Sequence, residues 1–113
     1  MDTNQLYKIT KLSHLDSALA IAAKDAESYW KNMHDSNESP NVDYWVVGYL
    51  NEGLPEIGNS LIVDRIIRNG VSMPGVFYTS PCSAIYDVSS DLNNPIIMLY
   101  TQNSCYSIEK YES

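Results

Sequence analysis

The chain has 113 residues, of which 44% are hydrophobic and 19% are charged, proportions that are ordinary for one globular domain. Fourteen acidic and seven basic side chains give a formal net charge of −7, which repels phosphates and disfavours nucleic acid as a partner. No apolar run reaches membrane-spanning length. We therefore expect one domain over residues 1–113 that binds neither nucleic acid nor membrane.

The start of the chain, MDTNQLYKIT, has neither the basic segment nor the apolar core of a signal peptide. This predicts a cytoplasmic location. The two cysteines, Cys82 and Cys105, form no CxxC pair. We expect free thiols in a reducing compartment, with a Cys82–Cys105 disulfide as the alternative.

A single helix is predicted at Ser13–Met33, because Ser13 followed by Asp16 resembles a capping box. Apolar residues then recur in steps of three and four, as in a helix that packs on a sheet. They are Leu15, Ala18, Leu19, Ala22, Ala26, Tyr29, Trp30 and Met33. Before this helix, Leu6–Ile9 is either a short strand or part of a frayed lead-in, and after it His34–Asn41 has the composition of a loop.

The rest of the chain has the pattern of short strands joined by turns. Val42–Leu50 has large apolar side chains on both faces, which predicts a covered strand, and Gly48 indicates a bulge or a close backbone approach. Asn69-Gly70 predicts a tight hairpin turn. The other strands that we expect are Leu61–Ile67, Gly75–Ser80, Ala84–Val88, Ile96–Thr101 and Ser104–Ile108.

Pro74-Gly75 fits the two central positions of a type II turn, and Val71–Met73 before it is either a short strand or a wide loop. Connections this short require antiparallel pairing. The predicted fold class is α+β. One N-terminal amphipathic helix packs on a curled antiparallel sheet, or on a small partly open β-barrel, of five to six strands.

The residues provide no catalytic or cofactor-binding motif. The two histidines, His14 and His34, lie at opposite ends of the predicted helix, roughly 30 Å apart at 1.5 Å per residue. They cannot share a metal or a proton relay, and no histidine is predicted near either cysteine. No glycine-rich phosphate loop precedes a helix. We expect a protein that is not an enzyme and has no metal or cofactor.

Ser60–Tyr86 carries a small basic excess within an acidic chain, because its only charges are Asp64, Arg65 and Arg68. Alternation places Arg65 on the strand face of Leu61, Val63 and Ile67, where it is either an anion clamp, an interface anchor or a side chain that packs on its neighbours and reaches solvent or a carboxylate. Polar residues at the predicted strand ends complete a candidate ligand or partner site, or else satisfy turns. With the two arginines they are Asn69, Thr79, Ser80, Thr101, Asn103, Ser104 and Tyr106.

Nine tyrosines and two tryptophans provide a second candidate surface. An aromatic surplus on an open sheet face makes a rigid protein-contact patch, whereas the alternative is packing within the core. The contact candidates are Tyr44, Trp45, Tyr49 and Tyr78.

Gly58–Ser80 has the pattern GNSL-x-V-x-R-x-x-RNG-x-x-x-PG-x-F-x-TS, and Thr101–Tyr106 has T-x-NS-x-Y. This combination resembles small uncharacterised accessory proteins of tailed bacteriophages. The resemblance implies a viral protein of the host-cell cytoplasm that is directed against the host. Such proteins block host enzymes or defence systems, CRISPR systems included, or sequester signalling nucleotides.

Two functions are therefore expected. The first is a non-enzymatic, phage-type binding protein that inhibits a host bacterial protein, belonging to a defence system, through protein–protein contacts. The alternative is a sponge that sequesters an anionic small molecule such as a signalling nucleotide. The first function predicts a monomer or a homodimer with an exposed aromatic patch. A third hypothesis, a structural or assembly role in a virion, would require obligate oligomers.

Overall fold

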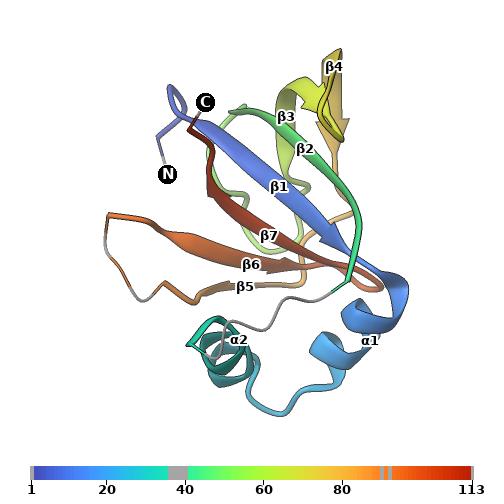
Figure 1. Cartoon of the computed structure of the whole chain (residues 1–113). Coiled ribbons are helices and arrows are strands. Elements are labelled where there is room, and N and C mark those ends of the chain that lie inside the picture. Colours follow the sequence, from blue (N-terminus) through green and yellow to red (C-terminus); the bar gives the residue numbers. More distant parts are fainter. Residues whose placement is uncertain (1, 36–40, 90, 92, 113) are drawn as a thin grey trace.

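The computed structural model describes residues 2–35, 41–89, 91 and 93–112, so part of the loop expected at His34–Asn41 lies outside the described residues. Within the described residues, seven strands form one open antiparallel sheet in the order β4-β3-β2-β1-β7-β6-β5, with two helices beside it (Figure 1). The strands are β1 Leu6–Leu12, β2 Val42–Leu50, β3 Ile62–Arg68, β4 Val71–Tyr78, β5 Ala84–Asp87, β6 Ile96–Tyr100 and β7 Cys105–Lys110. The helices are α1 His14–Ala22 and α2 Ala26–Asp35. The predicted α+β class with an antiparallel sheet is confirmed.

The helical region expected at Ser13–Met33 is present, but it is divided into two helices, α1 and α2. The predicted cap at Ser13 is confirmed, since the Asp16 N–H donates to Ser13 Oγ over 3.2 Å. Ala23 then adopts an extended conformation and ends α1. Asp25 caps α2 from the position before its first residue, because its carboxylate accepts a hydrogen bond of 3.1 Å from the N–H of Ser28.

The predicted apolar stripe also fails over its first half. Leu15 and Leu19 are 67% and 53% exposed, whereas α1 buries Ser17 and Ala20. Ser17 faces the sheet because its Oγ accepts a hydrogen bond of 3.2 Å from the Cys105 N–H at the start of β7. A buried backbone donor needs such a partner, and a leucine at this position cannot supply one.

The open question at Leu6–Ile9 is answered by the sheet. Leu6–Leu12 is a strand, and it lies at the centre of the order, paired with β2 on one side and β7 on the other. With it the sheet has seven strands, one more than the upper limit of the five to six that we expected. Tyr7 and Ile9 on this strand are almost fully buried.

The turn at Asn69-Gly70 is confirmed, because both residues have positive φ angles, 50° and 83°. Pro74-Gly75 does not form the expected turn. It lies inside β4, where the pairing with β3 shifts register between Arg65 and Ile67. A proline is tolerated there because β4 is an edge strand whose outer N–H groups have no ladder partner.

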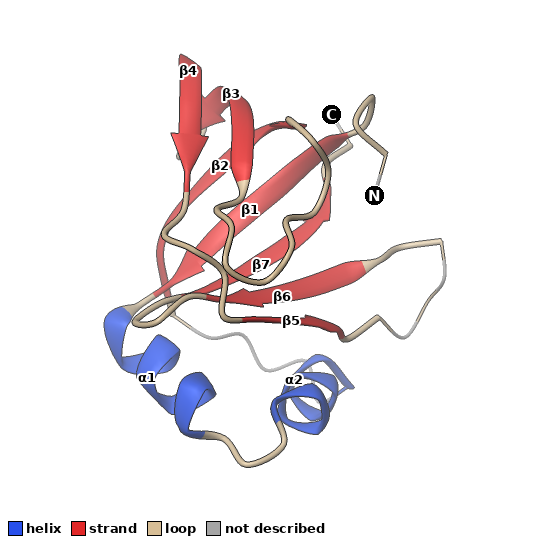
Figure 2. Cartoon of the chain, turned by 180° about the vertical axis from the view of Figure 1, so that it is seen from behind, coloured by secondary structure: helices blue, strands red, loops and turns tan. Residues whose placement is uncertain are grey.

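The two faces of the sheet carry separate clusters of buried side chains. The inner face, inside the curl of the sheet, carries Tyr7, Ile9, Val46, Val63 and Ile108. The outer face carries the second cluster, in which residues of α1 and α2 pack on β6 and β7. Figure 2 shows both helices beside the β5–β6–β7 end of the sheet, while the β3–β4 hairpin stands away from them.

Candidate functional site

A β-bulge brings Arg65 and Arg68 to the same face of β3. In the pairing with β2, Gly48 lies opposite Arg65 and Val46 lies opposite Arg68, so both arginines share the inner face. The bulge moves Ile67 to the outer face, opposite Val47. Alternation placed Ile67 with Arg65, and its continuation by one residue would put Arg68 on the opposite face, so the bulge changes the face of both Ile67 and Arg68.

Arg65 is held along the edge strand. Its Nε donates a hydrogen bond of 2.8 Å to the carbonyl oxygen of Met73. Its guanidinium lies against Gly75, where a Cβ atom would be only 3.0 Å from Nη2. The missing side chain of Gly75 therefore leaves the space that the arginine fills.

Arg68 lies over the ring of Tyr44, with 5.1 Å between its Cζ and the ring centroid. Lys11 Nζ is 5.5 Å from the same centroid and 3.4 Å from a carboxylate oxygen of Asp43. Cation–π contacts of this kind hold a long side chain in one orientation. Three cationic side chains, those of Lys11, Arg65 and Arg68, therefore lie on the inner face of the sheet.

Aromatic rings adjoin these cations. The ring of Phe77 is 6.0 Å from that of Tyr44 and 6.4 Å from that of Tyr106, edge to face in both cases. Tyr106 is buried, and burial raises the pKa of its phenol well above the ordinary value. Tyr44 and Ser104 lie close enough to this phenol to influence its pKa. Of the candidate residues, three lie on the inner face by strand register, namely Arg65, Arg68 and Tyr106. Ser104 lies near the Tyr106 phenol.

The other polar candidates make turn and strand-end hydrogen bonds. Asn69 Oδ1 accepts from the N–H of Trp45 over 2.9 Å. Thr79 is buried, and its Oγ1 accepts from the Leu61 N–H and donates to the Ser80 carbonyl.

The N–H of Thr101 donates to the Ser104 carbonyl over 2.9 Å, which closes the turn between β6 and β7. Ser80 and Asn103 are exposed. None of these polar groups contacts the Arg65–Arg68 pair through an interaction that the structure shows among the described residues.

A second surface, which we call the outer patch, consists of Tyr49, Ile62, Val76 and Tyr78. Register puts Ile62 opposite Tyr78, and Asp64 lies between Tyr49 and Val76 in one row, so all five side chains share the outer face. Val76 is 59% and Tyr78 70% exposed. Apolar side chains gathered in this way on one surface typically mark a contact with another molecule.

The four aromatic contact candidates divide between the two faces. Tyr49 and Tyr78 belong to the outer patch, whereas Tyr44 lies on the inner face. Trp45 is half-buried on the outer face, with Lys8 Nζ 4.7 Å from its ring centroid. Ile62 and Val76 were not among the residues expected from the sequence, although the absence of any charge from Val71–Tyr78 is a signal that could have indicated Val76.

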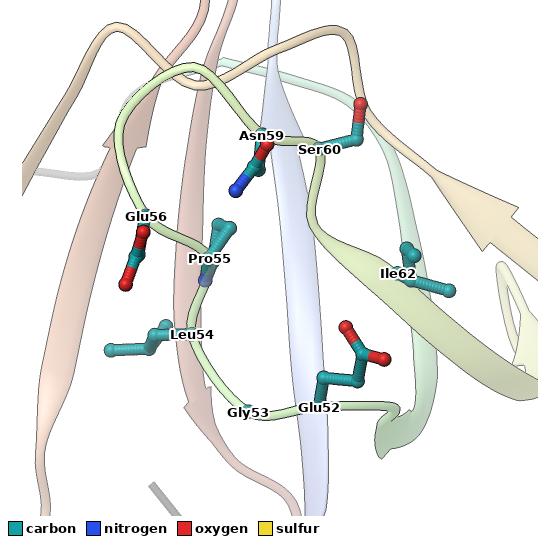
Figure 3. Close-up of a pocket in the computed structure, with 8 residues that line it drawn as sticks. All are labelled: Glu52, Gly53, Leu54, Pro55, Glu56, Asn59, Ser60 and Ile62. Atoms are coloured by element: carbon teal, nitrogen blue, oxygen red, sulfur yellow. The ribbon is translucent and has the colours of Figure 1, made fainter.

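A pocket of about 550 Å³ adjoins the outer patch through Ile62 (Figure 3). Its walls come from the loop between β2 and β3 and from the first residue of β3. They are formed by Glu52, Gly53, Leu54, Pro55, Glu56, Asn59, Ser60 and Ile62. Two carboxylates and no basic side chain line the pocket, so its charge suits a cation and opposes an anion. In the sequence, Gly53, Pro55 and Gly58 mark this segment only as a loop rich in turn residues.

The cysteines and the metal-ligating residue types show no reactive centre in the described part of the chain. Cys82 and Cys105 are free and buried, one in each cluster, and burial raises the pKa of both thiols. No group of three or more His, Cys, Asp or Glu side chains among the described residues is placed to hold a metal ion. No described helix has the length and apolarity needed to cross a membrane.

Comparison with protein families, with curated proteins and with solved structures finds no match to this chain.

Proposed function

We propose that the chain is a non-enzymatic binding protein that inhibits a host protein through protein–protein contacts, with the outer patch as its contact surface. The observation that carries this proposal is the exposure of Tyr49, Ile62, Val76 and Tyr78 on one face of three adjacent strands. Tyrosines on a sheet supply rigid contact area at little entropic cost. The β-sheet preorganises these side chains for binding, because it holds them in place in the free protein.

The charges beside the outer patch define the partner's surface. Asp64 lies within the patch, held by a hydrogen bond of 3.2 Å from Asn51. Glu52 and Glu56 line the adjoining pocket. The partner therefore presents an apolar surface bordered by lysine or arginine, one of whose side chains enters the pocket.

The biological setting of this proposal rests on the phage resemblance. Ile62, Val76 and Tyr78 all fall within Gly58–Ser80, the segment that resembles bacteriophage accessory proteins. The partner is accordingly a bacterial protein of the host cytoplasm, and a component of a defence system is the natural target of such a viral protein.

The test has two stages. A bacterial protein retained by the immobilised chain is first identified and purified, and its Kd is then measured for three forms of the chain. Tyr78→Ala is expected to weaken binding by about tenfold or more, because a central interface aromatic typically contributes over 1 kcal/mol. Leu19→Ala is the matched control, since Leu19 is an exposed apolar residue on α1, away from the patch. Equal binding by both variants, or failure to retain any bacterial protein, would contradict the proposal.

A further inference from the structure

The inner face of the β3–β4 hairpin carries Arg65 and Arg68, which take no part in the proposed protein contact through the outer patch. Residues three apart in a regular strand point to opposite faces. The bulge between Arg65 and Ile67 places both arginines of the chain on one face instead. Bulges commonly re-aim side chains beside binding sites.

Neither arginine has a carboxylate partner among the described residues. The ion pairs there are Lys11–Asp43 and Lys31–Glu27. In a chain with 14 acidic and seven basic side chains, an arginine readily finds an acidic neighbour. Two that share a face without one leave their charge available to an anion from outside the chain.

Both guanidinium groups are already oriented. Arg65 uses Nε to bind the Met73 carbonyl, which leaves the four N–H groups of its two Nη atoms. Arg68 lies over the ring of Tyr44, and its N–H donors lie in the plane of the guanidinium, directed away from its faces. Holding the side chains in this way reduces the entropy lost on binding.

We propose that Arg65 and Arg68 bind the phosphate of a free nucleotide on the inner face. Two guanidinium forks match a phosphate dianion in charge and in the number of acceptor oxygens. Phe77, whose ring lies 6.0 Å from that of Tyr44 on the same face, supplies aromatic surface for the base. The net charge of −7 repels a long polyanion, which favours the free nucleotide over DNA or RNA. The site is on the opposite face of β3 from the outer patch, so it does not depend on the proposed protein contact.

The test is a titration of the isotope-labelled protein with pyrophosphate and with AMP, followed by NMR. We expect the Arg65 Nε–H and the amide signals of residues 65–68 and 75–77 to shift, with saturation below about 10 mM. AMP should also shift the Tyr44 and Phe77 ring signals. Because these shifts are measured on the unmodified chain, they do not depend on whether a variant folds.

Variants then assign the site. Arg65→Gln and Arg68→Gln should each weaken pyrophosphate binding by about fivefold or more, since each removes charge-assisted hydrogen bonds. Lys24→Gln removes the same charge on the helix side of the chain and should change binding by less than about twofold. Tyr78→Ala should leave it unchanged, which separates this site from the outer patch. Absence of shifts at residues 65–68, equal shifts with sodium chloride, or equal weakening by Lys24→Gln would overturn the proposal.

Discussion

The phenol oxygen of Tyr100 accepts a hydrogen bond of 2.7 Å from the indole Nε1 of Trp30 and donates one of 3.2 Å to the carbonyl oxygen of Ala20. Tyr100 belongs to β6, Trp30 to α2 and Ala20 to α1. One buried hydroxyl therefore joins both helices to the sheet. Buried hydrogen bonds of this kind fix one arrangement, because any other leaves polar groups without partners.

Tyr100→Phe is expected to lower the free energy of unfolding by about 2 kcal/mol, because it leaves the buried Trp30 N–H without an acceptor. Urea denaturation measures the change. Tyr86→Phe is the matched control, since its ring packs edge to face on Tyr100 at 5.5 Å and its hydroxyl makes no hydrogen bond to another described residue. Equal losses in the two variants would contradict the role given to the Tyr100 hydroxyl.

Stability should also fall in alkali through the same residue. Burial raises the pKa of Tyr100 to about 12, whereas an unfolded tyrosine ionises near 10. Between these two pH values the unfolded chain releases this proton and the folded chain retains it, so rising pH favours unfolding. The stability advantage of the native chain over Tyr100→Phe should therefore be constant below pH 10 and shrink towards pH 12. Urea midpoints measured across this range test the sign, and an advantage that grows with pH would refute it.

Gly48→Ala should be strongly destabilising. An added Cβ would overlap the carbonyl oxygen of Asp64 and lie 2.8 Å from Val63 Cγ1 in the neighbouring strand. Backbone cannot yield as a flexible side chain does, so we expect a loss of about 3 kcal/mol. Gly58→Ala is the comparison, because nothing lies within 4 Å of its Cβ position and only its φ of +95° resists substitution, at about 1 kcal/mol. Thermal melts of the two variants rank these costs, and a smaller loss at Gly48 would refute the clash.

The two thiols should be unreactive in the folded protein. Cys82 and Cys105 are 2% and 0% exposed, and burial keeps both thiols protonated at neutral pH by raising their pKa. A disulfide-exchange reagent is expected to label neither cysteine in native buffer and both in denaturant. Rapid labelling of one thiol in native buffer would show that its cluster opens readily.

Local chemistry explains which parts of the fold could be predicted. The Ser13 cap, the Asn69-Gly70 turn and the strand Val42–Leu50 depend on residues a few positions apart, and all three are confirmed. Gly48 was expected at a bulge or a close approach, and it has both. The break before Asp25 was missed because the apolar steps continue through it, although Asp25 with Ser28 is itself a helix-start signal.

The candidate sites were less predictable, because a face is a property of the paired strands. The sequence drew attention to Arg65, Arg68 and the tyrosines, but alternation separated the two arginines that the bulge unites. Likewise, Leu15 and Leu19 fit a buried stripe, yet they are exposed because Ser17 turns the other side of α1 towards β7.

The α+β class, the Asn69-Gly70 turn and most strand positions could be predicted from the amino-acid sequence, since they follow from propensity, periodicity and capping within short windows. The central position of β1, the division of the helix, and the placement of the outer patch and the arginine pair on opposite faces of β3 emerge only in the folded chain. These outcomes depend on which strands pair and in what register, and a one-residue bulge is enough to change the face on which a side chain lies.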